Sequence, residues 1–413
     1  MKKIAVIGLI ILVTCSISFP LDSSNLIFGG LFGSGFEISG LFSSKDNNSK
    51  SKKDDTIIDK QFKVAMGKTL KMDLQIGSTI IITGWDKEEI DAKVYSDGRY
   101  AKDCQVDFEE NSDGVVINAE YKNGKKSKIN SDLRFEIKVP KKFQLNMDTI
   151  GGGITISDVE GQISGVTKGG SLSLNNLKGD LSLKTMGGSI ELTNSDVDGS
   201  VSTMGGNVLI SDVKGNVKGS TMGGNVTYKN VTRRDAGQES KEVVISSMGG
   251  SIDVDNAPNG ANVSTMGGDI KVGSVKEYIK AKTMGGDIRI EEADGSVDAT
   301  TMGGTIDVKL IADANASNHD VKLSSMSGNI TLYVPANFSM DVNISGVFEE
   351  GKTHEPSIIS DFDLNIKTKD YTDSDGDKDH GKKQVTGTGS FNGGKNRIQI
   401  KNVNGDIYLK KIQ

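Results

Sequence analysis

The sequence predicts an all-β chain, built as a single-chain parallel β-solenoid with 18-residue coils, and three observations carry this prediction. Thr-Met-Gly-Gly, or a close variant of it, recurs at a nearly fixed spacing. Between the copies, Ile and Val alternate with polar residues in two short stretches, which is typical of short strands. The chain has 51 Gly but only 5 Pro and 5% aromatic residues, a composition that favours many strands joined by tight turns.

The spacing of the motif sets the predicted length of each coil. The gaps between successive copies are 18, 18, 18, 18, 26, 18, 18, 18 and 24 residues. A fixed period of this kind is the signature of a solenoid, in which a repeat buries its apolar face only against its neighbours. Roughly ten coils would stack about 4.8 Å apart. The first residues of the copies are Thr149, Thr167, Thr185, Thr203, Thr221, Ser247, Thr265, Thr283, Thr301 and Ser325.

The motif itself is expected to form a corner. Its two Gly residues allow a sharp turn, including one at positive φ. Met is unbranched and fits irregular spaces, so the Met residues are expected to stack in a column. The Thr beside each Met is expected to point outward and form a ladder of hydroxyl groups, with a structural role as the main hypothesis and binding of ice or a polysaccharide as the alternative. The Met residues are Met186, Met204, Met222, Met248, Met266, Met284, Met302 and Met326.

Two insertions interrupt the period, TRRDAGQESK after Val231 and ADANASNHD after Ile311. Both fall between the first and the second strand of a coil, so we expect them to emerge from the same edge. Insertions that gather on one edge often mark a binding face. A corner that simply tolerates extra length is the main interpretation here.

The N-terminus has the pattern of an export signal. Lys2 and Lys3 precede the apolar stretch Ile4–Val13, which is too short for an ordinary membrane-spanning helix. LVTC resembles a bacterial lipobox and makes Cys15 the candidate lipid anchor, although Thr14 departs from the usual Gly, Ala or Ser. Ordinary cleavage after a later residue is the alternative. In both cases the chain is expected outside the cytoplasm, in the cell envelope or secreted, with a membrane tether at its N-terminus where Cys15 is lipidated.

These features divide the chain into six predicted segments. They are a signal or lipoprotein-type leader (1–20), a Gly-rich and charged flexible tether (21–55), N-terminal capping strands with the first coils (56–150), the regular Thr-Met-Gly-Gly solenoid (151–344), a loop-rich insertion (345–389) and a terminal coil (390–413).

The sequence predicts no catalytic, cofactor-binding or metal-binding residue. His319, His354 and His380 lie in insertions or loops and have no partner at metal-ligand spacing. The acidic stretch at 373–379 alternates Asp as calcium ligands can, but it lacks the Gly and Glu of an EF-hand, so calcium binding there stays open. The net charge is −6 without a basic block, which argues against a nucleic-acid partner.

The ends of the repeat region carry a family resemblance. FEIKVPKKFQLNMDT (135–149) echoes ITLYVPANFSMDVNI (330–344), and the chain closes with GSFNGGKNRIQIKNVNGDIYL. With the Thr-Met-Gly-Gly coils between them, these segments resemble the bacterial cell-envelope family described as "putative adhesin", a β-strand-repeat domain of unknown function. The resemblance covers about residues 57–413. It implies a fold but brings no catalytic motif.

The chain is therefore expected to be a non-catalytic, exported adhesin or surface scaffold with an unidentified cell-surface, glycan or protein ligand. One alternative is an envelope-stress or signalling accessory that binds a membrane protein. A lesser alternative is a polysaccharide-acting β-helix enzyme, whose carboxylates would come together only between coils. Binding without turnover separates the first two from the third.

Overall fold

The structure is a computed structural model. It describes residues 55–96, 103–122, 133–232, 244–313, 316–349, 357–372 and 378–412. Over these ranges the chain is all-β, as predicted, and it contains no α-helix. Consequently, no helix within them has the length and apolar character that crossing a membrane requires.

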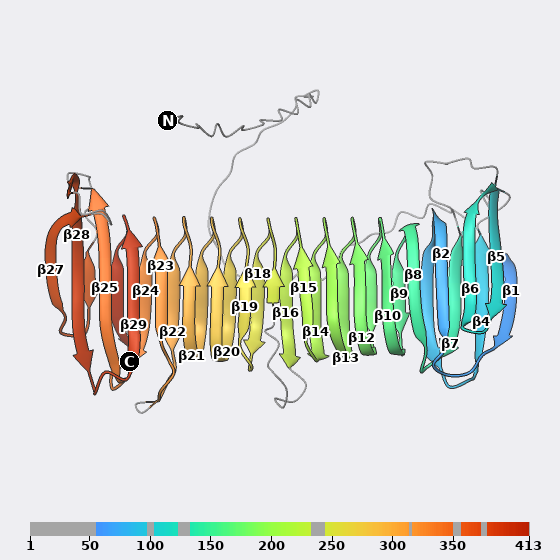
Figure 1. The fold of residues 1–413 in the computed structure, drawn as a ribbon, viewed down its shortest axis with the longest axis horizontal. Helices are drawn as coiled ribbons and strands as arrows, with labels where there is room; N and C mark the ends of the chain where they lie inside the picture. The colour runs from blue at the N-terminus through green and yellow to red at the C-terminus, as the bar shows by residue number, and fades with distance from the viewer. Residues whose placement is uncertain are drawn as a thin grey trace, which may run out of the picture. The chain divides into compact units, whose positions relative to one another are not determined.

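The 30 strands belong to one hydrogen-bonded sheet, and their pairing places them in two rows (Figure 1). Row A contains, in spatial order, β5 (Cys104–Asn111), β6 (Gly114–Tyr121), β2 (Thr69–Gly77), β8 (Gln144–Gly151), β10 (Glu160–Thr167), β12 (Lys178–Thr185), β13 (Ile190–Thr203), β15 (Val217–Thr221), β17 (Val244–Ser246), β19 (Ala261–Ser264), β20 (Ile270–Lys282), β21 (Ile288–Thr300), β23 (Val321–Ser325), β29 (Asn396–Val403), β25 (Met340–Glu349), β28 (Lys378–Phe391) and β27 (Asn365–Thr372). Row B contains β1 (Asp55–Lys63), β4 (Glu89–Ser96), β7 (Arg134–Pro140), β3 (Thr79–Trp85), β9 (Ile154–Ser157), β11 (Leu172–Asn175), β13, β14 (Val208–Lys214), β16 (Val226–Thr232), β18 (Ile252–Ala257), β20, β21, β22 (Ile306–Leu310), β24 (Ile330–Pro335), β30 (Ile407–Ile412) and β26 (Ile358–Ser360). The long strands β13, β20 and β21 contribute to both rows.

Successive repeats pair in parallel and in register. Ile190 pairs with Val208, and Val208 pairs with Val226, so the offset equals the 18-residue period. The first insertion leaves this register unchanged, because Val226 pairs with Ile252 in the next repeat. The second insertion is bridged in the same way. The strand partners that the period predicts are therefore confirmed.

Rows A and B face each other across one hydrophobic core. The approach is close at Gly219 in row A, where an added Cβ would lie 2.7 Å from the hydroxyl oxygen of Tyr228 in row B. A small residue thus leaves room for the largest fully buried ring of the core. The Tyr228 hydroxyl donates to the carbonyl oxygen of Val217 at 2.9 Å, and burial raises the pKa of Tyr228 well above its ordinary value.

At the N-terminal end, the strands change from parallel to antiparallel pairing. β1, β4 and β7 pair antiparallel in row B, and β5 and β6 do so in row A. β2 lies between β6 and β8, and β3 lies between β7 and β9. The chain therefore passes from β7 to β8 across the coil that β2 and β3 form.

The C-terminal segment 390–413 does not form the last coil of the stack, so that prediction is wrong. β29 pairs in parallel with both β23 and β25 (Figure 1). β30 pairs in parallel with both β24 and β26. The segment is accepted between two other coils because its apolar residues match theirs in register, with Val321 beside Ile398 and Ile330 beside Ile407. The repeat rule identified a coil here but could not give its place in the stack.

The segment 345–389, predicted to be rich in loops, instead contains long strands. β28 pairs antiparallel with β25 on one side and with β27 on the other. Antiparallel partners can be joined by short turns and need no repeat motif, so the loss of the 18-residue period does not mean a loss of strands. Most of the acidic stretch 373–379 lies outside the described residues, and calcium binding there stays a prediction.

Candidate functional site

The Thr or Ser of each corner is buried, and the prediction of an outward hydroxyl ladder is wrong. These side chains are at most 5% exposed. At Thr221, Oγ1 donates to the carbonyl oxygen of Gly206 in the preceding repeat at 2.8 Å, and it accepts the N–H of Gly224 at 3.2 Å. Both hydrogen-bonding directions are satisfied, so the hydroxyl group can be buried at little cost. Because the row faces inward, it offers no surface to ice or to a polysaccharide.

Replacement of Thr221 by Val is expected to lower the free energy of unfolding by about 1–3 kcal/mol, because the shape is kept while the Gly206 carbonyl and the Gly224 N–H lose their partner. Urea denaturation followed by circular dichroism measures this loss. Ser220→Val, at the half-buried neighbouring position, is the matched control and should change stability little. Equal losses in the two variants would contradict the buried hydroxyl bridge.

The Met residues of the corners form the predicted column, but on the outside. The eight side chains are 45–51% exposed. The N–H of Met266 donates to the carbonyl oxygen of Met248 at 3.3 Å, and that of Met284 donates to Met266 at 3.2 Å, so the column runs along adjacent backbones. Met points outward because it directly follows the inward Thr, and side chains alternate along an extended chain.

The residue after the two Gly residues forms a polar row with a structural role. The side-chain oxygen of one repeat accepts the backbone N–H of the next, at 2.9 Å from Asn207 to Asn225 and at 2.9 Å from Asp269 to Asp287. Asp287 in turn accepts from Thr305 at 2.7 Å. The stacked acids at this position are therefore engaged by backbone groups, and they do not form a pair of free carboxylates for glycoside hydrolysis.

The side chains on the outer face of row B differ between the early and the late repeats. In its early repeats, the outward residues include the short side chains of Thr155, Ser157 and Ser173. In its later repeats, β18, β20, β21, β22, β24 and β30 present charged and aromatic residues, and these surround an open depression of about 970 Å³. The side chains that border it include Asp255, Arg289, Glu291, Glu292, Asp307, Lys309, Tyr333, Asp361, Lys410 and Lys411.

A glycine helps to hollow this surface. An added Cβ at Gly273 would lie 2.5 Å from the carbonyl oxygen of Asp255, so the position accepts no side chain. Acidic and basic groups face each other beside it: Glu291 Oε1 lies 3.4 Å from Lys271 Nζ and 3.7 Å from Arg289 Nε. The depression therefore offers paired charges of both signs rather than a field of one sign.

Tyr333 on β24 contributes an aromatic ring to the border of the depression. Lys410 Nζ lies 5.8 Å from the ring centre of Tyr333 and 5.2 Å from that of Tyr408, a cation–π arrangement. The Tyr408 hydroxyl donates to Asp406 Oδ2 at 3.3 Å, and burial together with Asp406 raises the pKa of Tyr408. Flat rings beside hydrogen-bonding groups suit a polar ligand, whereas an opening to bulk water does not provide the water exclusion that many catalytic sites use.

The sequence analysis missed this depression. Asp255, Gly273, Glu291 and Lys309 are successive positions of the 18-residue period, so aligning the repeats could have brought out this part of the surface. Tyr333, Lys410 and Lys411 follow longer gaps in the sequence, and only the observed pairing of β24 with β22 and β30 brings them alongside.

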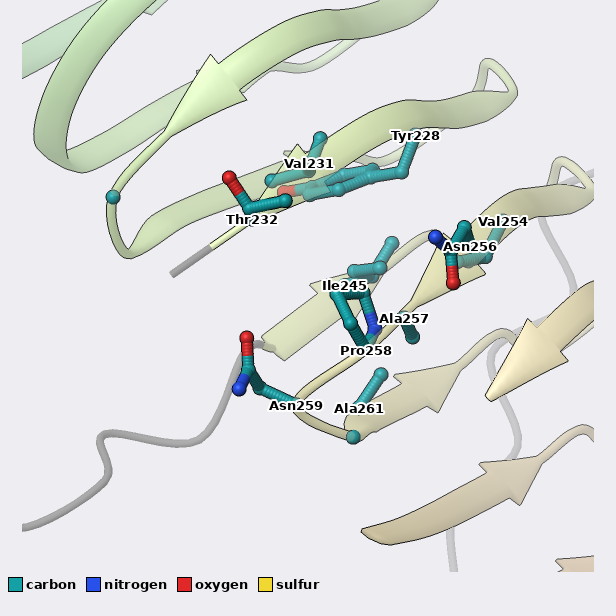
Figure 2. Close-up of a pocket in the computed structure, with 12 residues that line it drawn as sticks. Tyr228, Val231, Thr232, Ile245, Val254, Asn256, Ala257, Pro258, Asn259 and Ala261 are labelled. Carbon is teal, nitrogen blue, oxygen red and sulfur yellow. The ribbon is translucent and has the colours of Figure 1, made fainter. Parts of the chain in front are cut away.

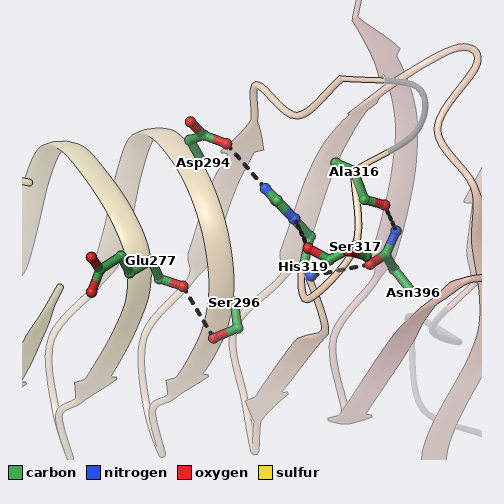
Figure 3. A network of polar contacts seen from close by, with 7 residues as sticks. All are labelled: Glu277, Asp294, Ser296, Ala316, Ser317, His319 and Asn396. Carbon is green, nitrogen blue, oxygen red and sulfur yellow. Dashed lines mark hydrogen bonds and ion pairs between the residues drawn. The ribbon is translucent and has the colours of Figure 1, made fainter. Parts of the chain in front are cut away.

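His319 is part of a structural network rather than a catalytic one (Figure 3). Its Nε2 lies 3.0 Å from Asp294 Oδ1, and its Nδ1 lies 2.9 Å from the carbonyl oxygen of Ser317. Its backbone N–H donates to Asn396 Oδ1 at 3.0 Å, and Asn396 Nδ2 donates to the carbonyl oxygen of Ala316 at 2.9 Å. The network thus ties the second insertion to the first residue of β29.

The remaining sequence candidates do not add a site. Cys15 and His354 lie outside the described residues, as does the side chain of His380. Within the described ranges, no group of three or more His, Cys, Asp or Glu side chains is placed to hold a metal ion. Cys104 is buried and forms no disulfide.

A small cavity of about 20 Å³ lies beside the end of β16 (Figure 2). Apolar side chains, among them Val231, Ile245, Val254 and Pro258, contribute to its lining. The space is about that of a single water molecule, and an apolar lining gives a water few partners. The cavity is therefore too small for an organic ligand.

The similarities found between this chain and known proteins are all to solved structures. No family model matches the chain, and no curated protein matches it. A Bacteroides fragilis structure described as a "putative adhesin" is 16% identical, covering 62% of this chain and 96% of its own, with a TM-score of 0.29. A Clostridium sporogenes "putative cell adhesion protein" is 10% identical, covering 86% and 100%, with a TM-score of 0.16. A Parabacteroides distasonis "putative lipid binding protein" is 15% identical, covering 60% and 95%, with a TM-score of 0.29. Two of these three structures are described as adhesion proteins and the third as a lipid binding protein.

Proposed function

We propose that the chain is a non-catalytic, exported cell-envelope protein, an adhesin or surface scaffold built as a parallel β-solenoid. The observation that carries this proposal is the depression on the late repeats of row B. It presents charges of both signs and the aromatic ring of Tyr333 on a surface that is open to solvent. Such a surface suits reversible binding better than chemistry that requires a closed site.

The ligand that fits this depression best is a polar chain of the glycan type. The ring of Tyr333 offers a flat apolar face, while Arg289, Glu291 and Lys309 offer donors and acceptors for hydroxyl groups. A strongly charged polymer fits less well, because acidic and basic groups are interleaved around the rim. A sugar chain that runs across the strands would meet a new set of side chains in each repeat.

The N-terminal segments complete the proposal. A leader over 1–20 exports the chain, a tether over 21–55 separates it from the membrane, and lipidation of Cys15 anchors it. The coils would then hold the binding face away from the surface that carries the anchor. These features rest on the sequence pattern of the N-terminus.

The test is a binding screen of the full chain against cell-wall fragments, polysaccharides and matrix proteins, read both for bound protein and for released product. Saturable binding without product is the expected result. Combining Arg289→Ala with Tyr333→Ala should raise Kd at least about tenfold, equivalent to about 1.4 kcal/mol. Combining Glu191→Ala with Lys229→Ala, at outward positions of earlier strands in the same row, is the matched control and should leave Kd unchanged.

Three results would redirect the proposal. Equal weakening in both variants would remove the depression as the binding site. Released product would favour the polysaccharide-acting enzyme. A screen without any binding would contradict the adhesin hypothesis. Capture of a membrane protein partner would then be the next experiment.

A further inference from the structure

The exposed Met column is the feature of the fold that packing does not explain. Eight of the 13 Met residues of the chain occupy the same outward position in eight successive repeats, each 45–51% exposed. In contrast, Met72, Met147 and Met340 are buried in the core in the ordinary way. We define the Met ridge as Met186, Met204, Met222, Met248, Met266, Met284, Met302 and Met326.

The turn does not require Met at this position. Ile150 and Lys168 take the same place in the first two copies of the motif. The N–H of Lys168 donates to the carbonyl oxygen of Thr149 at 3.1 Å, and the N–H of Met186 donates to that of Thr167 at 3.1 Å. Lys and Met thus make the same backbone bond, so the fold leaves the choice of side chain free.

Other exposed positions carry different residue types in successive repeats, whereas the ridge carries Met in every one. One outward position of row B carries Glu191, Leu209 and Thr227 in three paired strands, and Lys271 and Arg289 in later ones. A single residue type retained eight times on the surface, where the backbone imposes none, indicates a role for the side chain itself. The group that Met supplies, and that Leu or Lys does not, is the thioether sulfur.

The spacing of the ridge suits a soft cation. Neighbouring Met residues lie on adjacent hydrogen-bonded backbones, about 4.8 Å apart. A cation bound linearly by two sulfurs, with bonds of about 2.3 Å, needs sulfurs at nearly this separation. Thioethers select soft monovalent cations such as Cu⁺ over hard ones. A Gly follows each Met of the ridge except Met326, which is followed by Ser327, and it adds no side chain on that side of the ridge.

We propose that the Met ridge is a linear array of binding sites for a soft monovalent cation of the Cu⁺ type, each site formed by the thioethers of two neighbouring repeats. Eight Met residues give seven neighbouring pairs. The site unit is the pair, so binding depends on adjacency and not on the number of Met residues. This inference is independent of the depression on row B.

The test uses Ag⁺, a redox-inert stand-in for Cu⁺, with the full chain in nitrate buffer free of chloride. All variants carry Cys15→Ala and Cys104→Ala, so that no thiol competes for the ion. Ag⁺ bound per chain after equilibrium dialysis is the readout. One variant replaces alternate ridge residues by Leu (M204L, M248L, M284L and M326L) and leaves no neighbouring pair. Its matched control replaces four consecutive ones (M186L, M204L, M222L and M248L) and leaves three pairs.

Saturable binding by the parent chain is expected, with about half of it kept in the consecutive variant and nearly all of it lost in the alternating variant. Both variants lose the same number of sulfurs and keep the same apolar bulk, and circular dichroism verifies that both are folded. Equal Ag⁺ binding in the two variants would overturn the pairwise site. Absence of saturable binding in the parent chain would overturn the proposal altogether.

Discussion

Replacement of Gly224 by Ala is expected to lower the free energy of unfolding by about 3 kcal/mol or more, whereas the same change at its neighbour Gly223 should cost less than about 1 kcal/mol. An added Cβ at Gly224 would lie 2.2 Å from the carbonyl oxygen of Gly206 in the preceding repeat. At Gly223 the nearest atoms, the carbonyl oxygens of Gly205 and Met204, both lie at 3.5 Å, an ordinary contact. Urea denaturation of the two single variants measures the difference.

The asymmetry between the two glycines has a structural cause. The atom that a Cβ at Gly224 would meet belongs to backbone, and it cannot move without separating the two hydrogen-bonded repeats. The second Gly of other corners, Gly206 and Gly286 among them, meets the preceding repeat in the same way at 2.4 Å and 2.1 Å. Similar losses at Gly223 and Gly224 would show that the corner does not pack as described.

The direction in which the Thr and Met side chains of the corner point could be predicted from the sequence. The two-residue alternation from Val217 passes through Gly219 to Thr221, so the pattern itself places Thr inside and Met222 outside. The expected outward ladder of hydroxyl groups is the opposite arrangement. The alternation prevails because the carbonyl oxygen of Gly206 satisfies the buried hydroxyl, and a bond between repeats is not visible in one repeat alone.

The order of the coils at the two ends could not be predicted, although the sequence marks both places. Val-Pro ends both β7 and β24, and Phe follows three residues later, where the chain crosses one coil to enter β8 or β25. Phe143 and Phe338 are only 1% and 0% exposed, so each fills the core at such a crossing. The similarity between the two segments is visible in the sequence. The sequence does not show that a coil from a distant part of the chain lies between the two strands that each segment connects.

A chain that ends at Lys395 is expected to lose the ordered structure of its C-terminal end, because β29 and β30 lie inside the stack rather than beyond it. Ile398, Ile400, Ile407 and Leu409 are each at most 1% exposed, and their burial contributes roughly 6–12 kcal/mol in total. Their removal leaves β23 and β25 without the strand that joins them. This loss is comparable to the whole stability of an ordinary domain.

The damage should stay local, because each repeat of such a stack is stabilised mainly by its immediate neighbours. Trypsin is therefore expected to cut the truncated chain rapidly at Lys382 and Lys383, while the repeats over 154–232 and 244–310 remain protected, as mass spectrometry of the fragments would show. A chain that ends at Lys411 keeps nearly all of β30 and serves as the matched control, with Lys382 and Lys383 protected. If 390–413 were instead an outer coil, β25 would pair directly with β23, and truncation at Lys395 would leave Lys382 and Lys383 as resistant as in the control.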